Sequence, residues 1–304
     1  MLRQPGRVAA PPDWVEHPER GSVLAMRLAV WLMLALGRPL GRILLVPICA
    51  YFVLFSSHAR SASAGYLRRV LGRRATLGDV FRHYYTFAST IQDRVYFLAG
   101  RISSYDVQIH AGLQTQALLR DGRGCILLGS HLGSFEVLRA CGPGEGVPPI
   151  NILMYVDNAG KLNSVLRPLA PGAEARVIPL GSPDALLRVH ECLARGEIVG
   201  ILGDRAWRSE RTYRCEFLGG EARFPLGPLL LAGLVQAPVV LFFGIYRGGR
   251  RYEIHLETFA DAIPLERRNR EESVRPWVER YAKRLEHHCR EAPYNWFNFY
   301  DYWA

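Results

Sequence analysis

Short apolar runs alternate with helix-like stretches from about residue 80 to the end of the chain. The run 125–128 is apolar throughout, which is typical of a strand buried on both faces of a parallel sheet. Ser182 and Pro183 begin an expected helix over 183–194, and Gly196 follows its end. The alternation predicts an α/β fold, with a mostly parallel mixed sheet flanked by helices. We expect helix 79–98 and then strands at 105–109, 125–129, 150–155, 176–179, 197–202, 238–246 and 251–258.

The amino-terminal quarter has a different pattern. Residues 23–36 and 43–55 are strongly apolar, but polar and helix-breaking residues between Arg38 and Arg42 interrupt them. Neither run reaches the roughly 20 residues of a membrane-spanning helix. We therefore expect two short helices that lie on or dip into a membrane, with a single tilted crossing or a buried helical hairpin as alternatives.

Arginines flank these apolar runs and could contact anionic lipid headgroups: Arg27, Arg60, Arg68, Arg69, Arg73 and Arg74. The patterns together divide the chain into three parts. We expect a mobile amino terminus at 1–22, an apolar helical membrane-associating segment at 23–75, and an α/β domain at 76–304.

A histidine and a glutamate lie five residues apart where strand 125–129 turns into a helix expected at 134–141. Residues at this spacing do not share a helix face, so His131 belongs to the loop and Glu136 to the early helix. A carboxylate that accepts the imidazole Nδ1–H fixes the tautomer and leaves Nε2 as a general base. The pattern predicts that Glu136 orients His131; a core histidine beside an unrelated surface glutamate is the alternative. Asp204 follows another strand, and its position at a carboxyl end favours a shared site.

Composition narrows the possible partners. The 304 residues are 49% hydrophobic, which is ample for a large core, and 38 Lys+Arg against 28 Asp+Glu give a formal net charge of +10. This charge favours phospholipid headgroups, nucleic acid or an acidic carrier protein. Dispersed arginines and the apolar amino-terminal runs disfavour nucleic acid. Six cysteines without CxxC pairs predict a reduced compartment and no metal site, and no phosphate-loop or GxGxxG motif supports a nucleotide cofactor.

Several motifs resemble one enzyme family in order and spacing. HLGSFE at 131–136 resembles the first motif of the lysophospholipid acyltransferase superfamily, specifically of the bacterial lipid A biosynthesis lauroyl/myristoyl acyltransferases. ILGDRAW at 201–207, FLGG at 217–220 and FPLGPLLLAGLVQAPVV at 224–240 resemble further segments of that family, and APYNWFNFYDYW at 292–303 resembles its terminal segment. The resemblance covers roughly residues 20–303 and implies a glycerolipid acyltransferase-like fold.

The resemblance also implies roles for individual residues. His131 would be the general base for direct attack of a hydroxyl on an acyl thioester, without a covalent enzyme intermediate. Backbone N–H groups around Gly133 and Ser134 would stabilise the oxyanion. Asp204 and Arg205 would bind the polar head of the acceptor or organise the base.

Weaker patterns provide further candidates for substrate binding. Arg223 could pair with an anionic headgroup or with the phosphopantetheine phosphate of a carrier protein, although a solvated arginine is an equal alternative. Gly227 opens an expected helix whose N–H groups could bind an anion. Lys161 and Asn163 lie where the family has an Arg-Pro-x-x-Asn motif. Ser134 as a nucleophile is a competing idea, but the chain lacks a GxSxG motif around it.

The resemblance implies an O-acyltransferase at the cytoplasmic face of the bacterial inner membrane. It would move a fatty acyl chain from an acyl carrier protein or coenzyme A thioester to a hydroxyl of a lipid or glycolipid, with membrane lipids and the carrier as partners and no bound cofactor. The ending WFNFYDYW lacks the basic residues of the lipid A enzymes and is similar to the subgroup found with aryl polyene pigment synthesis. A thioesterase or lipase using the same site is the alternative activity.

Overall fold

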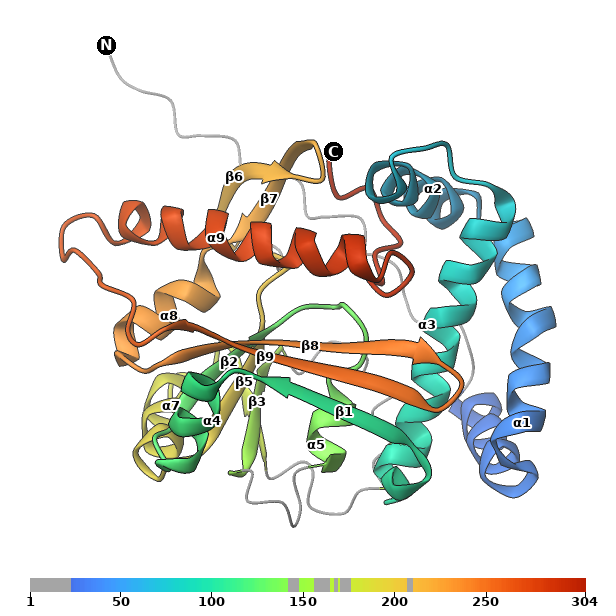
Figure 1. Cartoon of the computed structure of the whole chain (residues 1–304), viewed down its shortest axis with the longest axis horizontal. Coiled ribbons are helices and arrows are strands. Elements are labelled where there is room, and N and C mark those ends of the chain that lie inside the picture. The colour runs from blue at the N-terminus through green and yellow to red at the C-terminus, as the bar shows by residue number, and fades with distance from the viewer. Residues whose placement is uncertain (1–22, 142–147, 156–164, 167–168, 170–175, 207–209) are drawn as a thin grey trace.

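A seven-stranded sheet forms the centre of the molecule, in the order β1-β9-β8-β2-β5-β3-β4 (Figure 1). The computed structural model describes residues 23–141, 148–155, 165–166, 169, 176–206 and 210–304, so the predictions for residues 1–22, Lys161 and Asn163 lie outside the described residues. The strands are β1 (Asp106–Ala111), β2 (Cys125–Gly129), β3 (Ile150–Met154), β4 (Val177–Pro179), β5 (Ile198–Leu202), β8 (Val239–Gly248) and β9 (Arg251–Ala260). All neighbours pair in parallel except β8 and β9. The predicted mixed, mostly parallel sheet is confirmed.

Helices cover both faces of this sheet (Figure 1). Alternate residues of β2 point to opposite faces, as a strand requires: Leu128 packs in one cluster with Leu285 of α9, whereas Leu127 packs in another with Leu118 of α4. All five residues of β2 are buried, as the apolar run predicts. The helices are α1 (Val23–Phe55), α2 (Ser57–Leu71), α3 (Leu77–Leu98), α4 (Leu113–Arg120), α5 (Glu136–Cys141), α7 (Ala185–Ala194), α8 (Gly227–Val235) and α9 (Arg270–Glu291), with a short 3₁₀ turn at Ile102–Ser104.

Helix α1 consists of two helices that meet at a kink, in line with the two helices that the sequence predicts. The second helix includes the polar residues between Arg38 and Arg42, which the prediction left between the two helices. Gly37 has a φ of 79°, which kinks the helix at that point, and Pro39 lies in the first turn after the kink. The 19-residue part Gly37–Phe55 is long and apolar enough to cross a membrane, yet 28% of it is buried against the protein. Its outward side chains include Ile43, Leu54 and Phe55, each at least 65% exposed.

A buried ion cluster fixes α1 to α3, beside which it lies (Figure 1). The Nε of Arg38 and the Nη2 of Arg42 each lie 2.7 Å from a carboxylate oxygen of Asp93, which is fully buried. The hydroxyls of Tyr105 and Tyr252 also donate to this carboxylate, both at 2.8 Å. The polar residues that interrupt the apolar pattern are therefore the residues that hold α1 on the α/β domain.

Three of the flanking arginines are engaged within the protein. Arg60 donates to the carbonyl of Val53 at 2.7 Å, and Arg73 pairs with Asp79 at 2.8 Å. Arg69 lies over the ring of Trp303, 4.6 Å from its centroid. These three guanidinium groups thus stabilise the fold around α2, which reduces the number available for lipid headgroups.

An antiparallel hairpin, which the strand pattern did not predict, packs beside α9. It consists of β6 (Thr212–Phe217) and β7 (Gly220–Pro225). Phe217 of this hairpin lies 5.2 Å, centroid to centroid, from Trp296 in the carboxyl-terminal segment. The hairpin therefore helps to fix the segment that forms one wall of the candidate site.

Candidate active site

His131 and Asp204 meet at the carboxyl-terminal edge of the parallel strands. β2 ends at Gly129 and β5 at Leu202, and these two residues are register partners. Each functional residue lies two positions beyond its strand, so the strand pairing brings them to the same level. The Nδ1 of His131 lies 2.9 Å from Oδ1 of Asp204, and the backbone N–H of His131 donates to Oδ2 at 3.0 Å. The structure thus brings these two residues together, as their positions at the ends of two strands predict.

This pairing fixes the tautomer of the imidazole. An ionised carboxylate only accepts hydrogen bonds, so the proton of a neutral His131 ring lies on Nδ1 and the lone pair on Nε2. Nε2 makes no hydrogen bond within the part of the chain that the structure describes. The side chain is 35% exposed, which makes the free nitrogen accessible to a substrate.

Asp204 is fully buried and ionised. Burial opposes its ionisation, but the interactions with His131 outweigh the burial and hold the pKa of this carboxyl well below its usual range. Arg205 lowers the pKa further, as does the indole N–H of Trp296, which donates to Oδ2 at 3.0 Å. A buried carboxylate cannot reach the polar head of an acceptor, so the contacts of Asp204 are with His131 and other protein groups.

The protein environment keeps His131 neutral near pH 7. Desolvation by the surrounding protein lowers the pKa of the imidazole, and the positive charge of Arg205 lowers it further. The carboxylate of Asp204 opposes both effects, but the pKa remains below the ordinary value of 6.5. A neutral imidazole with a free Nε2 has the protonation state that a general base requires.

The prediction that Glu136 orients His131 is wrong for this structure. Glu136 begins α5, and one of its carboxylate oxygens lies 3.1 Å from Arg94 of α3. The other oxygen accepts from Arg139, one helical turn further on, at 3.2 Å. Asp204 is the carboxylate that accepts the Nδ1–H. Glu136 joins α5 to α3 through Arg94 and so helps to position the loop that carries His131.

The expected oxyanion-binding N–H groups are also engaged elsewhere. The N–H of Gly133 donates to the carbonyl of Asn295, and the N–H of Ser134 donates to the carbonyl of Gly244, both at 2.8 Å. Helix α5 begins at Glu136, later than the expected 134. Gly133 has a φ of 75°, and a Cβ there would lie 1.8 Å from the Gly244 carbonyl oxygen. The glycine is therefore required for close packing of this loop on β8, and its N–H is not free for a substrate.

Arg205 is a described cation whose charge acts on both members of the pair. One end of its guanidinium group donates to the carbonyl of Phe297, and the group lies over the ring of Tyr300, 5.5 Å from the centroid. Its Nε is buried and makes no hydrogen bond with any described residue. Arg205 thus places a positive charge close enough to His131 to lower the pKa of the imidazole.

Two further predicted substrate-binding residues, Arg223 and Gly227, make no hydrogen bond with either member of the pair in the described structure. Arg223 is on the exposed side of β7, where its neighbours Ala222 and Phe224 point into the core. Gly227 begins α8 as expected, and a Cβ there would lie 2.2 Å from Glu210 Oε1. A carboxylate at this position disfavours an anion at the start of α8, which contradicts the anion-binding role predicted for Gly227.

The carboxyl-terminal segment contributes residues that the sequence patterns did not identify as part of the site. Trp296 donates to Asp204, and the hydroxyl of Tyr302 donates to the backbone carbonyl of Asp204 at 2.6 Å. The N–H of Phe297 donates to the carbonyl of His131 at 2.9 Å. The dense aromatic run in WFNFYDYW was the available signal, but it indicates packing and does not reveal which polar group the rings contact.

The comparison with protein families agrees with this arrangement. The sequence model of the bacterial lipid A biosynthesis acyltransferase family matches residues 114–304. The chain belongs to this family. A search of curated proteins finds no match to the sequence.

The family match includes every residue of the site in this acyltransferase, from the His131 loop to the carboxyl-terminal segment. It begins after α1, α2 and α3, of which α1 carries most of the exposed apolar side chains. The membership supports an acyltransferase activity in lipid biosynthesis, and together with the apolar segment Gly37–Phe55 it suggests membrane association.

Proposed function

We propose that this acyltransferase moves a fatty acyl chain from a thioester to a hydroxyl of a lipid or glycolipid, with His131 as the general base. The single observation that carries the proposal is the hydrogen bond of 2.9 Å between Nδ1 of His131 and buried Asp204, which leaves Nε2 facing outward as the only basic nitrogen of the ring. The pair replaces the His131–Glu136 arrangement expected from the sequence.

The reaction needs two proton movements. Nε2 of His131 takes the hydroxyl proton of the acceptor as its oxygen attacks the thioester carbonyl, and the imidazolium that forms is stabilised by ionised Asp204. When the tetrahedral intermediate collapses, the carbon–sulfur bond breaks and the imidazolium returns the proton to the leaving thiolate. The products are an ester and a thiol, and the enzyme is regenerated without a cofactor or a covalent intermediate.

Arg205 is the best candidate in the described chain to stabilise the oxyanion. Its positive charge acts on both His131 and Asp204, whereas the N–H groups of Gly133 and Ser134 are already bonded to carbonyls. A fixed positive charge in a site of low polarity stabilises developing negative charge more than the same charge in water does. The same charge would also attract an anionic acceptor headgroup.

The donor in this proposal is an acyl carrier protein thioester, with a coenzyme A thioester as the second possibility. The net charge of +10 would attract an acidic carrier protein and speed its association. The acceptor is a lipid A-like glycolipid or an aryl polyene lipid, in line with the family and with the WFNFYDYW ending.

The enzyme would act at the cytoplasmic face of the inner membrane, where acyl thioesters and lipid acceptors meet. Exposed apolar side chains on α1 support this location, and the contacts of α1 with α3 favour a helix that lies against the membrane surface over one that leaves the domain to cross it.

A test of this function compares the wild type with His131→Ala in a membrane assay that contains an acyl carrier protein thioester and extracted lipid acceptors. The variant should transfer acyl groups at least ~10²-fold more slowly, since general bases contribute that much. His190→Ala, an exposed histidine on α7, is the matched control and should keep the wild-type rate.

Mass spectrometry of the products distinguishes transfer from hydrolysis. An acylated lipid supports the proposal, while free fatty acid formed at the same rate with or without acceptor would show a thioesterase or lipase. The structure gives the hydrolase no nucleophile at Ser134, because no hydrogen bond joins Ser134 to His131 among the described residues.

A further inference from the structure

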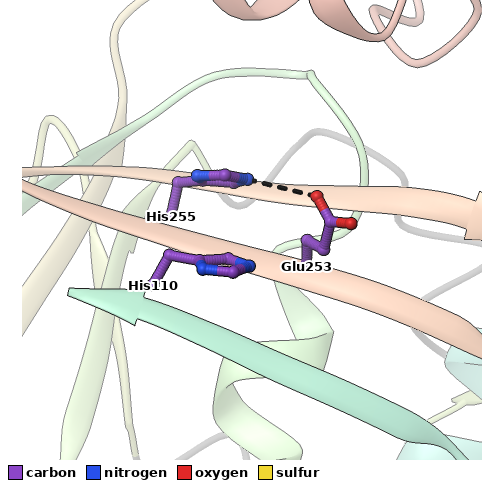
Figure 2. Close-up of side chains that lie close together, drawn as sticks. All are labelled: His110, Glu253 and His255. Atoms are coloured by element: carbon purple, nitrogen blue, oxygen red, sulfur yellow. Dashed lines mark ion pairs between the residues drawn. The ribbon is translucent and has the colours of Figure 1, made fainter.

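Two histidines and a glutamate on strands β1 and β9 lie close together. His110 of β1 and His255 of β9 are register partners in a parallel pair. Glu253 lies two residues before His255 on β9, and residues two apart on a strand point to the same face. Figure 2 shows the two imidazole rings stacked, with one nitrogen of each ring directed toward the Glu253 carboxylate.

The distances within this trio suit a small cation. One nitrogen or oxygen from each side chain lies within 4.8 Å of the others. His255 Nε2 is 3.5 Å from Oε2 of Glu253, close to the spacing of about 3.3 Å between two ligands on one tetrahedral zinc ion. The two rings are 4.9 Å apart at their centroids, so a side-chain rotation of His110 would bring its nitrogen closer to the other two ligand atoms.

One buried nitrogen of the trio lacks a hydrogen-bond partner among the described residues. Nε2 of His255 is buried and makes no hydrogen bond with any described residue, although its charged neighbour Glu253 is close. An unsatisfied buried nitrogen costs free energy, and a bound cation would remove that cost. The trio is also open to solvent on the side of His110, which is exposed, so an ion and a water ligand can enter.

A competing cation is present at the glutamate. Arg247 lies 2.7 Å from Oε2 of Glu253, so a metal ion must share the carboxylate with it or take the other oxygen. His288 of α9 lies behind His255, with ring centroids 5.1 Å apart, and is committed to Glu257 at 2.7 Å. The available ligands are therefore two imidazoles and one carboxylate.

We propose that His110, Glu253 and His255 bind one divalent transition-metal ion, for which zinc is the best match. Two imidazoles and one carboxylate are a common zinc ligand set, and water would fill the fourth position. The sequence does not show this site as a short motif, because one ligand lies on β1 and two on β9, more than 140 positions later in the chain. Only the strand register brings them together.

A bound ion would stabilise the β1 edge of the sheet and would take no part in acyl transfer. β9 is separated from β2, which carries His131, by β8, and neighbouring strands are about 4.8 Å apart. β1 is an edge strand with mostly exposed side chains, held to the sheet by β9 alone. A metal bridge from β1 to β9 would fix this edge, since binding to the folded state alone stabilises it.

The test uses the full-length protein in detergent after removal of metals with a chelator. Zinc titrated by calorimetry should bind with one ion per chain, and His110→Ala should weaken the affinity at least tenfold. This variant is chosen because His110 is exposed on an edge strand and its loss leaves the core intact. His190→Ala is the matched surface control and should bind as the wild type does. Zinc should also slow hydrogen exchange of the β1 amides in the wild type.

Two further measurements can overturn the proposal. A second group, His287, His288 and Glu291 on α9, could hold an ion instead; loss of binding in His287→Ala, with normal binding in His110→Ala, would place the site there. Cobalt(II) should give a spectrum without a thiolate charge-transfer band, and such a band would assign the ion to a cysteine. Absence of zinc binding in the wild type, or unchanged binding in His110→Ala, would also contradict the proposal.

Discussion

His83 is a buried imidazole that connects helix α3 to the wall of the active site. Its Nε2–H donates to the carbonyl of Trp296 at 2.9 Å, and its Nδ1 accepts from the hydroxyl of Ser63 at 2.8 Å. Trp296 in turn donates to Asp204. Burial lowers the pKa of His83 to about 4, since a charged ring inside the core would lose its hydration.

This histidine should make the protein less stable in mild acid. The unfolded chain takes up the proton near pH 6.5, but the folded protein does so only near pH 4, so the unfolded state binds more protons between these values. Stability is full above pH 6.5 and falls as the pH drops toward 4. We expect the free energy of unfolding to fall by about 2 kcal/mol from pH 7 to pH 5 through this residue.

Denaturant unfolding of the detergent-solubilised protein at pH 7, 6 and 5 measures this effect. His83→Gln should show a smaller loss of stability over that range than the wild type, and His190→Ala should show the wild-type loss. Equal pH dependence in His83→Gln and the wild type would mean that His83 does not titrate as described.

The partner of His131 illustrates what single residues in a sequence can and cannot reveal. His131 and Asp204 each follow a buried strand, and these positions were enough to predict that the two residues share a site. The five-residue spacing of His131 and Glu136 suggested the wrong carboxylate, because proximity along the chain does not fix the direction of a side chain at the start of a helix. Arg94, on helix α3 and more than 40 positions earlier in the chain, pairs with the Glu136 carboxylate instead.

At the scale of helices, the ion cluster around Asp93 holds α1 on the catalytic domain. Two arginines and two tyrosine hydroxyls contact its buried carboxylate. Removal of one member of a buried ion group leaves uncompensated charge, which is strongly destabilising. Asp93→Asn should therefore lower the free energy of unfolding by roughly 3 kcal/mol and increase hydrogen exchange in the part of α1 after Gly37.

Asp121→Asn, at an exposed position after α4, is the matched control and should leave both quantities unchanged. Thermal unfolding and hydrogen-exchange mass spectrometry in detergent measure the two effects. If Asp93→Asn behaves like the control, the cluster does not anchor α1.

Strands and helices with strong apolar patterns were predictable, and those that depend on distant contacts were not. β2 and β5 follow directly from apolar runs that only a doubly covered sheet can bury. The hairpin β6–β7 alternates exposed and buried residues. Its inward Phe217 and Phe224 are stabilised by contacts with Tyr302 in the distant carboxyl-terminal segment, which the local pattern does not show. The second half of α1 begins earlier than its apolar run predicts, because Arg38 and Arg42 in its first turns are stabilised by Asp93, some 50 residues later.

At the scale of the whole molecule, most exposed apolar side chains lie at one end, and helices α4 and α7 lie at the other. Figure 1 shows α1 and α3 together at one end of the molecule, with α4 and α7 at the other. The exposed apolar side chains concentrate on α1, whereas α4 and α7 contribute only a few, such as Leu113. This distribution predicts that the α1 end faces the membrane.

Charged substitutions on α1 test this orientation. Ile43→Glu, at a side chain that is 65% exposed, should reduce binding to lipid vesicles by about a hundredfold, since a charge in the apolar layer costs roughly 3 kcal/mol. Leu113→Glu places the same charge on α4, where the leucine is 86% exposed, and should bind as the wild type does. Vesicle sedimentation measures both. Equal binding of Ile43→Glu and the wild type would rule out α1 as the membrane contact.

The central claim is that Asp204, and not Glu136, orients the catalytic imidazole. It is tested most directly by kcat/KM for acyl transfer in Asp204→Asn and Glu136→Gln, with melting temperatures to confirm that both fold. Asp204→Asn should reduce kcat/KM at least ~10²-fold, because an amide disfavours the tautomer with Nδ1–H and cannot stabilise the imidazolium. Glu136→Gln keeps a hydrogen-bond acceptor for the arginines and should stay within about tenfold of the wild type. A large loss in folded Glu136→Gln with near-normal activity in Asp204→Asn would contradict the account.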